Sequence, residues 1–173
     1  MTDGLERARE QRNWLERLAA KIPGFRGYFE HELRREVDKI QRDWIADQID
    51  RGRSGVQEKI REWSRRGQLQ NLDLASSMEK MLDRLANRVR HADYGNSGFF
   101  DAIKIREEEL DALYRFDLEL SVLVEDLAAR IEALPGEAEE TTIRAALDTV
   151  LQADRLFDER AYRIENVTQK GIR

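Results

Sequence analysis

The chain has 173 residues, of which 38% are charged and 40% are hydrophobic, and its net charge is −5. This length suits one folded domain, and the mixture of residue types excludes a wholly disordered chain. No stretch reaches the roughly 20 apolar residues of a transmembrane helix. The chain has no cysteine, which excludes disulfides and thiolate metal sites, and we expect a cytoplasmic protein.

Helices are expected from the start of the chain, because apolar residues recur at intervals of three and four. The first helix is predicted at residues 3–22 and the second at residues 25–51. Gly52 and Gly55 are expected to end or bend the second helix. A short third helix is predicted at residues 54–66, and its first residue, a serine, is expected to cap it.

The second half of the chain carries the longest regular patterns. The fourth helix is predicted at residues 73–92, the fifth at 106–134 and the sixth at 139–166. Alternation of three and four is typical of a coiled-coil seam. In the fourth helix the seam residues are Ala75, Met78, Leu82, Leu85, Val89 and Ala92.

The fold that follows from these elements is all-α. We predict an elongated bundle of five or six mostly antiparallel helices, since no segment alternates with the period of two that a strand requires. A single domain is expected at residues 1–166, with a frayed tail at residues 167–173.

Known helical catalytic and metal-binding motifs fail at individual positions. A di-iron bundle needs Glu-x-x-His on two helices, but Tyr28 and Arg88 stand three residues before the two histidines. A zinc protease helix needs a second histidine where Arg35 stands. We therefore predict no catalytic residue, no metal and no cofactor.

Two aspartates interrupt otherwise apolar seams. Asp117 lies in the fifth predicted helix and Asp154 in the sixth. A buried carboxylate is costly unless it is paired, so each is expected to pair with an arginine or a backbone donor of another helix. The alternative is that the two lie together and hold a cation, or serve an enzyme of unrecognised type.

Positive charge is concentrated in residues 51–66, which contain six Lys or Arg and two Glu. Arg61, Arg65 and Arg66 are its candidate surface residues, which suit a membrane surface or nucleic acid. We favour a charged surface helix that packs through Val56, Ile60 and Trp63, because the chain as a whole is acidic. Nucleic acid is not an expected partner, and a membrane surface is a second choice.

The stretch "HADYGNSGFFDAIKI" at residues 91–105 interrupts the helical pattern with two glycines and three aromatic residues. Phe99 and Phe100 are expected to cap the core after a glycine turn. The alternative is that Tyr94, Phe99 and Phe100 anchor a partner.

"GFRGYFEHELRREVDK" and "ADYGNSGFFDAIK" resemble stretches of an uncharacterised group of bacterial all-helical proteins. The resemblance implies a bacterial cytoplasmic origin and no particular activity. Residues 1–91 carry a net charge of +4 and residues 92–173 one of −9, an asymmetry that can steer association. The leading hypothesis is a non-enzymatic interaction module, an adaptor, scaffold or assembly factor that binds another protein or itself.

Overall fold

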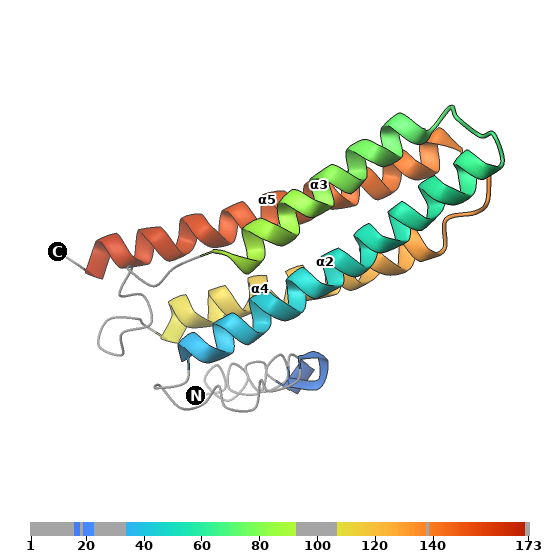
Figure 1. Ribbon diagram of the computed structural model, residues 1–173. Coiled ribbons are helices and arrows are strands. Elements are labelled where there is room, and N and C mark those ends of the chain that lie inside the picture. The colour runs from blue at the N-terminus through green and yellow to red at the C-terminus, as the bar shows by residue number, and fades with distance from the viewer. Residues whose placement is uncertain (1–15, 18, 23–33, 93–106, 138, 172–173) are drawn as a thin grey trace. The chain divides into compact units, whose positions relative to one another are not determined.

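The computed structural model describes residues 16–17, 19–22, 34–92, 107–137 and 139–171. Its helices with defined bounds are α2 (Arg34–Arg65), α3 (Leu72–Arg90), α4 (Glu107–Glu132) and α5 (Glu140–Gly171), drawn in Figure 1. No residue in these described ranges belongs to a strand. The prediction of an all-α fold built from packed helices is therefore confirmed.

The chain divides into two compact units. Unit 1 comprises Met1–Trp44, Asp93–Glu119 and Glu159–Arg173, and unit 2 comprises Ile45–Ala92 and Leu120–Asp158. The helices α2, α4 and α5 contribute residues to both units, whereas α3 lies in unit 2. The expectation of one domain at residues 1–166 stays a prediction.

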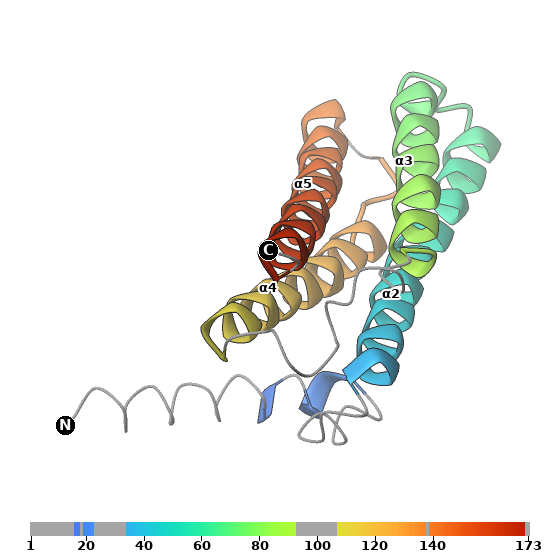
Figure 2. The same ribbon diagram turned by 90° about the vertical axis from the view of Figure 1, so that its left-hand side faces the viewer.

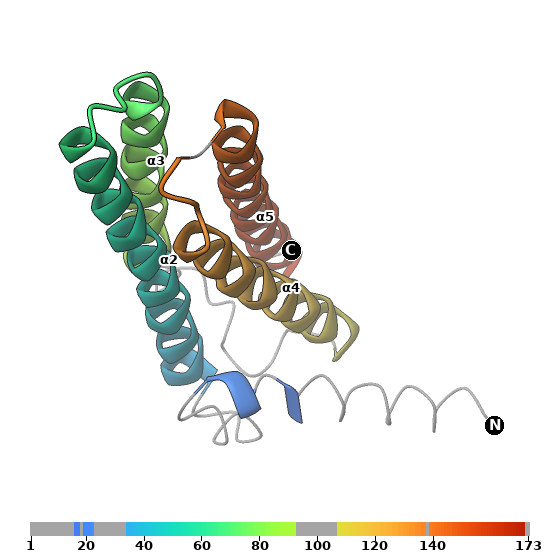
Figure 3. The same ribbon diagram turned by 90° about the vertical axis from the view of Figure 1, so that its right-hand side faces the viewer.

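Unit 2 consists of two antiparallel helix pairs. Its part of α2 turns into α3 through residues 66–71, and its part of α4 turns into α5 through residues 133–139. Figures 2 and 3 show from opposite sides that both turns lie at the same end of this unit. The short connections explain the antiparallel pairing, because two to eight residues allow only an immediate reversal.

The core of unit 2 follows the predicted seams. The buried residues of α3 are Ala75, Met78, Leu82, Leu85, Ala86 and Val89. The apolar residues of α4 and α5 that are also buried in unit 2 include Leu120, Val124, Leu127, Ile131, Ile143, Val150 and Phe157. Full burial of one such Leu, Ile or Val side chain contributes about 1.5–3 kcal/mol, so the seams supply the main driving force for this unit.

The predicted break in α2 is wrong. The helix runs without interruption from Arg34 to Arg65, through Gly52 and Gly55, and Ser54 does not cap a new helix. The Ser54 hydroxyl instead donates to the Asp50 carbonyl oxygen at 3.0 Å, one turn earlier in the same helix.

The two glycines are packing positions rather than stops. A Cβ atom on Gly55 would lie 3.0 Å from Cγ2 of Ile131, and one on Gly52 would lie 3.2 Å from Cδ1 of the same side chain. Ile131 is fully buried on α4. The missing side chains let α2 and α4 approach closely at this isoleucine.

The boundaries of α3, the boundaries of α4 and the start of α5 agree with the sequence to within a few residues, and α5 extends further than predicted. The predicted start of the second helix at residue 25 lies outside the described residues. Gly67 ends the α2 turn with a φ of 72°, a conformation that suits glycine. The helix α5 continues to Gly171, beyond its predicted end at residue 166 and into the segment predicted to fray. Most of the first predicted helix, residues 3–22, lies outside the described residues.

None of the helices among the described residues is both long enough and apolar enough to cross a bilayer.

Close packing at Gly55 is testable by substitution. Gly55→Val should lower the free energy of unfolding by about 1–3 kcal/mol, because its side chain overpacks against Ile131. The matched control is Ser54→Val, which places the same side chain on the exposed neighbouring position and should change stability by less than about 0.5 kcal/mol. Urea unfolding followed by circular dichroism measures both, and equal effects of the two substitutions would contradict the packing role.

Candidate functional site

A buried arginine lies at the centre of unit 1. Arg160 of α5 is 2% exposed, Asp117 of α4 is 1% exposed and Asp38 of α2 is 4% exposed. The Arg160 Nε atom donates to Asp117 Oδ1 at 2.5 Å, and its Nη2 atom donates to Asp38 Oδ1 at 2.6 Å. One cation therefore links two carboxylates that come from two other helices.

Further polar groups surround the two carboxylates. Arg42 donates to Asp38 at 2.8 Å from the next turn of α2. Gln41 is 1% exposed, and neither its amide nitrogen nor its amide oxygen makes a hydrogen bond of standard geometry. Burial, the largest influence, raises the pKa of the Asp117 carboxyl, and nearby Asp38 adds to the rise, while Arg160 and the adjacent Gln41 amide oppose it.

This buried cluster is suited to a structural role. Its arginine and both carboxylates are at most 4% exposed, so a substrate cannot reach them without movement of a helix. A bidentate arginine contact fixes both distance and orientation between the helices it joins. The prediction that Asp117 pairs with an arginine of another helix is confirmed.

Asp154, the second predicted carboxylate, lies in unit 2 and is half-buried. It accepts a hydrogen bond from Arg88 of α3, which also pairs with Asp158. The Arg88 guanidinium lies 5.7 Å from the centre of the Phe157 ring. The predicted pairing with an arginine of another helix is thus confirmed for Asp154 too, and no group of metal-ligating side chains was found within the described ranges.

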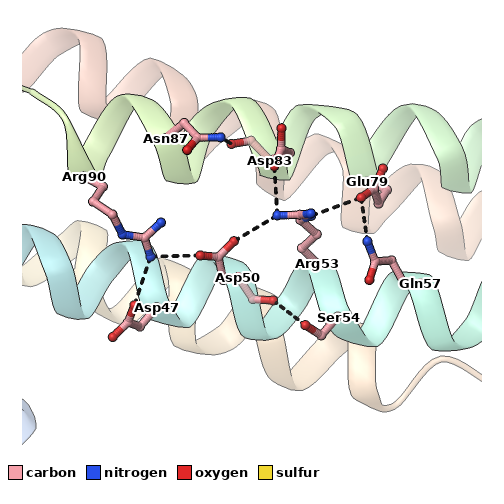
Figure 4. Close-up of polar contacts among 9 residues, drawn as sticks. All are labelled: Asp47, Asp50, Arg53, Ser54, Gln57, Glu79, Asp83, Asn87 and Arg90. Carbon is pink, nitrogen blue, oxygen red and sulfur yellow. Dashed lines mark hydrogen bonds and ion pairs between the residues drawn. The ribbon is translucent and has the colours of Figure 1, made fainter.

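An extended polar network joins α2 to α3 on the surface of unit 2 (Figure 4). Arg53 contacts Glu79 at 3.0 Å and Asp83 at 2.8 Å on the facing helix. Arg90 of α3 reaches back to Asp50 at 2.8 Å and to Asp47 at 3.0 Å on α2. These contacts run in both directions across the helix pair, so they fix its register.

Glu79 receives two donors from α2. The Gln57 amide donates to Glu79 Oε1 at 2.8 Å and Arg53 donates to the same oxygen. The hydrogen bond from Gln57, followed by that from Arg53, lowers the pKa of the Glu79 carboxyl. Its environment is therefore opposite in effect to that of Asp117.

Most cations of the basic segment 51–66 are paired inside unit 2. Arg51 contacts Glu132 at 2.8 Å, and Lys59 and Arg66 both contact Glu62, at 3.4 Å and 2.9 Å. Val56 and Trp63 are buried and Ile60 is half-buried, so the packing interpretation of this segment is confirmed. Of the three candidate surface arginines, Arg61 and Arg65 remain exposed without an ion pair to any described acidic residue.

A small hollow opens where the two turns of unit 2 meet. It is lined by Trp63, Gln68, Gln70, Asn71 and Glu137, and its volume is about 70 Å³. The Trp63 indole N–H donates to the Pro135 carbonyl oxygen at 3.4 Å, which joins the two turns. Beside the hollow, Leu69 is 65% exposed. We call the surface formed by residues 61–71, 133–137 and 139–140 the end face.

Tyr94, Phe99 and Phe100, the candidate partner-binding aromatic residues, lie outside the described residues. Whether they cap the core or contact a partner stays a prediction.

Searches against protein-family models, curated proteins and solved structures found no match to this chain. Function is therefore inferred from the residues themselves.

Removing the buried cation tests its importance. Arg160→Ala should lower the free energy of unfolding by about 3–5 kcal/mol, because it leaves two carboxylates buried without their shared partner. Arg155→Ala, at an exposed arginine of the same helix, should change it by less than about 0.5 kcal/mol. Chemical denaturation gives both values, and a small loss in Arg160→Ala would show that the cluster is dispensable.

The opposite pKa shifts of Asp117 and Glu79 predict opposite pH dependences. A raised folded-state pKa favours the protonated form, so wild-type stability relative to Asp117→Asn should rise as the pH falls through the raised pKa of Asp117, and level off below about 3.9. A lowered pKa favours the ionised form, so wild-type stability relative to Glu79→Gln should be lost as the pH falls from about 4.3 through the folded-state pKa.

Thermal or urea unfolding between neutral pH and acid measures both differences. The two variants serve as controls for each other, because general effects of acid on the molecule cancel in each comparison. Differences that change in the same direction would contradict the assigned environments.

Proposed function

We propose that the protein is a non-enzymatic interaction module, an adaptor, scaffold or assembly factor, and that it contacts its partner through the end face of unit 2. The observation that carries the proposal is the position of Leu69, which is 65% exposed beside a polar hollow. An exposed apolar side chain next to a pocket for a partner's side chain is the arrangement found at the centre of many interfaces.

The size of the hollow favours a protein partner over a small molecule. Its volume of about 70 Å³ is far below the roughly 300–1,000 Å³ of ordinary ligand pockets. It is several times the roughly 10–15 Å³ that a cavity needs to hold one water molecule, which leaves room for the end of a polar side chain.

The paired cations of residues 51–66 support this choice over a polyanionic partner. Arg51, Arg53, Lys59 and Arg66 are each held by a carboxylate of unit 2. Binding to nucleic acid or an anionic membrane requires cations that can neutralise phosphates and so displace the counterions held there, and a cation already paired contributes little. Nucleic acid or an anionic membrane is the alternative partner.

The enzyme alternative has weaker support. Asp117 is inaccessible beneath Arg160, and Asp154 is engaged by Arg88. Neither carboxylate lines the hollow. The proposal keeps a bacterial cytoplasmic setting, for which the sequence resemblance and the absence of cysteine are the support.

The test compares partner binding by surface variants. Leu69→Ser should abolish capture of the protein's partner from an extract of its native host, because it removes the apolar anchor of the end face. Leu151→Ser is the matched control, since Leu151 is 37% exposed on α5 outside the end face. Both variants should melt within a few degrees of the parent, because exposed substitutions cost about 0.5 kcal/mol or less.

Two results would contradict the proposal. One is equal capture of the same partner by wild type and Leu69→Ser. The other is binding of wild type to duplex DNA, RNA or anionic vesicles that is lost with added salt and in Arg61→Glu/Arg65→Glu, which would favour the polyanion alternative.

A further inference from the structure

We infer that the partner of the end face is a second copy of this chain, with Arg65 of each copy placed in the hollow of the other against Glu137. This inference rests on the proposed function, because it names the partner of the same surface. It is carried by the charges of the end face, the chemistry of the hollow and their position on one surface.

The two turns of the end face carry opposite charge. The α2 side presents Arg61 and Arg65, which are exposed and form no ion pair with any described acidic residue. The α4–α5 side presents the exposed Glu137 and Glu139, whereas Glu140 is paired with Arg144 at 2.5 Å. A partner of one sign would meet repulsion at one of the two turns, whereas a surface that itself carries both signs satisfies both.

The hollow fits a guanidinium group. Its lining includes Glu137, Gln68 and Gln70, whose side chains carry one carboxylate and two amide groups, together with Trp63. A guanidinium has five N–H donors in a planar fork and no acceptor, and carboxylate and amide oxygens are its usual partners. The volume of about 70 Å³ is far below that of an ordinary ligand pocket and leaves room for the end of one side chain.

The neighbouring Arg66 is not available to enter the hollow of a second copy, because contacts within unit 2 hold it. It pairs with Glu62 at 2.9 Å. Its guanidinium also lies where a side chain on Gly136 would be, since a Cβ atom there would lie 2.4 Å from Arg66 Nη1. Arg65 is thus the exposed arginine nearest the turn that forms no ion pair with a described acidic residue. Its Nε atom donates to the Arg61 carbonyl oxygen at 3.3 Å, an exposed hydrogen bond that it would exchange for Glu137 of a second copy.

Because Arg65 and the hollow both belong to the end face, a two-fold axis would join two copies into a closed dimer. When a protruding group and its acceptor lie on the same surface, a two-fold axis places each in contact with its counterpart on the other copy. The axis would bring the exposed Leu69 side chains of the two copies together between the two arginine contacts. The interface would contain two copies of the Arg65–Glu137 contact.

The size of the end face sets the strength of the association. Four helix ends, each about 10 Å across, present roughly 400 Å², about half of the 800 Å² per partner of a stable complex. The dimer is therefore weak, concentration-dependent and sensitive to salt.

The experiment uses charge reversal in the full chain. Sedimentation velocity is recorded from about 1 to 500 µM at about 50 mM and again at about 500 mM NaCl. Wild type should dimerise at low salt, and Arg65→Glu and Glu137→Arg should each weaken the dimer about tenfold or more, because both contacts become repulsive. An equal mixture of the two variants should dimerise again, since the mixed dimer contains one native and one reversed attractive contact.

Arg155→Glu is the matched control, because it reverses an exposed arginine outside the end face and should leave the dimer unchanged. Circular dichroism confirms that each variant is folded. The inference is overturned if wild type is monomeric throughout, if either reversal leaves the dimer intact, or if the mixture fails to associate. A monomeric wild type whose capture of a different protein is lost in Leu69→Ser would overturn this inference and leave the proposed function standing.

Discussion

A charged side chain at or near the core must be paired, and this constraint determines much of the structure of a chain in which 38% of the residues are charged. Arg160 meets it in unit 1 by sharing its guanidinium between Asp117 and Asp38. In unit 2, where the arginines are only half-buried, Arg53 and Arg88 also pair with carboxylates of another helix. In each case the pair joins different helices, so the requirement that neutralises a charge also specifies which helices pack and in which register.

The same requirement decides which charges are left for function. Arginines that hold helices together cannot also attract a distant partner, so the basic appearance of residues 51–66 overstates the cations available at the surface. Arg61 and Arg65 lie beyond the reach of the described carboxylates, at the last turns of α2. Their position at one end of unit 2, where the other turn carries Glu137 and Glu139, leaves exposed charge of both signs at that end.

The helices and seams were predicted well from the sequence, because burial of one helix face makes apolar residues recur every three or four positions. The residues from Ala75 to Val89 that were predicted to face a partner helix are buried. The prediction at Gly52 and Gly55 was wrong because a glycine can either end a helix or allow another helix to pack closely. Only the structure, which places Ile131 against both glycines, distinguishes these two roles. Asp117 was found by its interruption of a seam.

The other two members of the buried cluster, Arg160 and Asp38, were not predicted from the sequence. Arg160 lies three residues after Phe157 and four before Ile164, a spacing that places it on the buried side of α5 and could have identified it. A pairing between residues 43 or 122 positions apart is invisible to local pattern, so its partners required the structure. The hollow was missed for the same reason, because its lining comes from two turns far apart in the chain.

The end face depends on contacts well inside unit 2. The ion pairs of Arg53 and Arg90 fix how far α3 slides along α2, and the glycine contact with Ile131 fixes α4 against α2. These contacts set both turns at the same end, where the Trp63 indole N–H meets the Pro135 carbonyl. A shift of one helical turn, about 5.4 Å, in either pair would separate Glu137 from Gln68 and remove the hollow. The register of α2 against α3 and α4 that pairs the charges inside unit 2 is thus also the register that forms the end face.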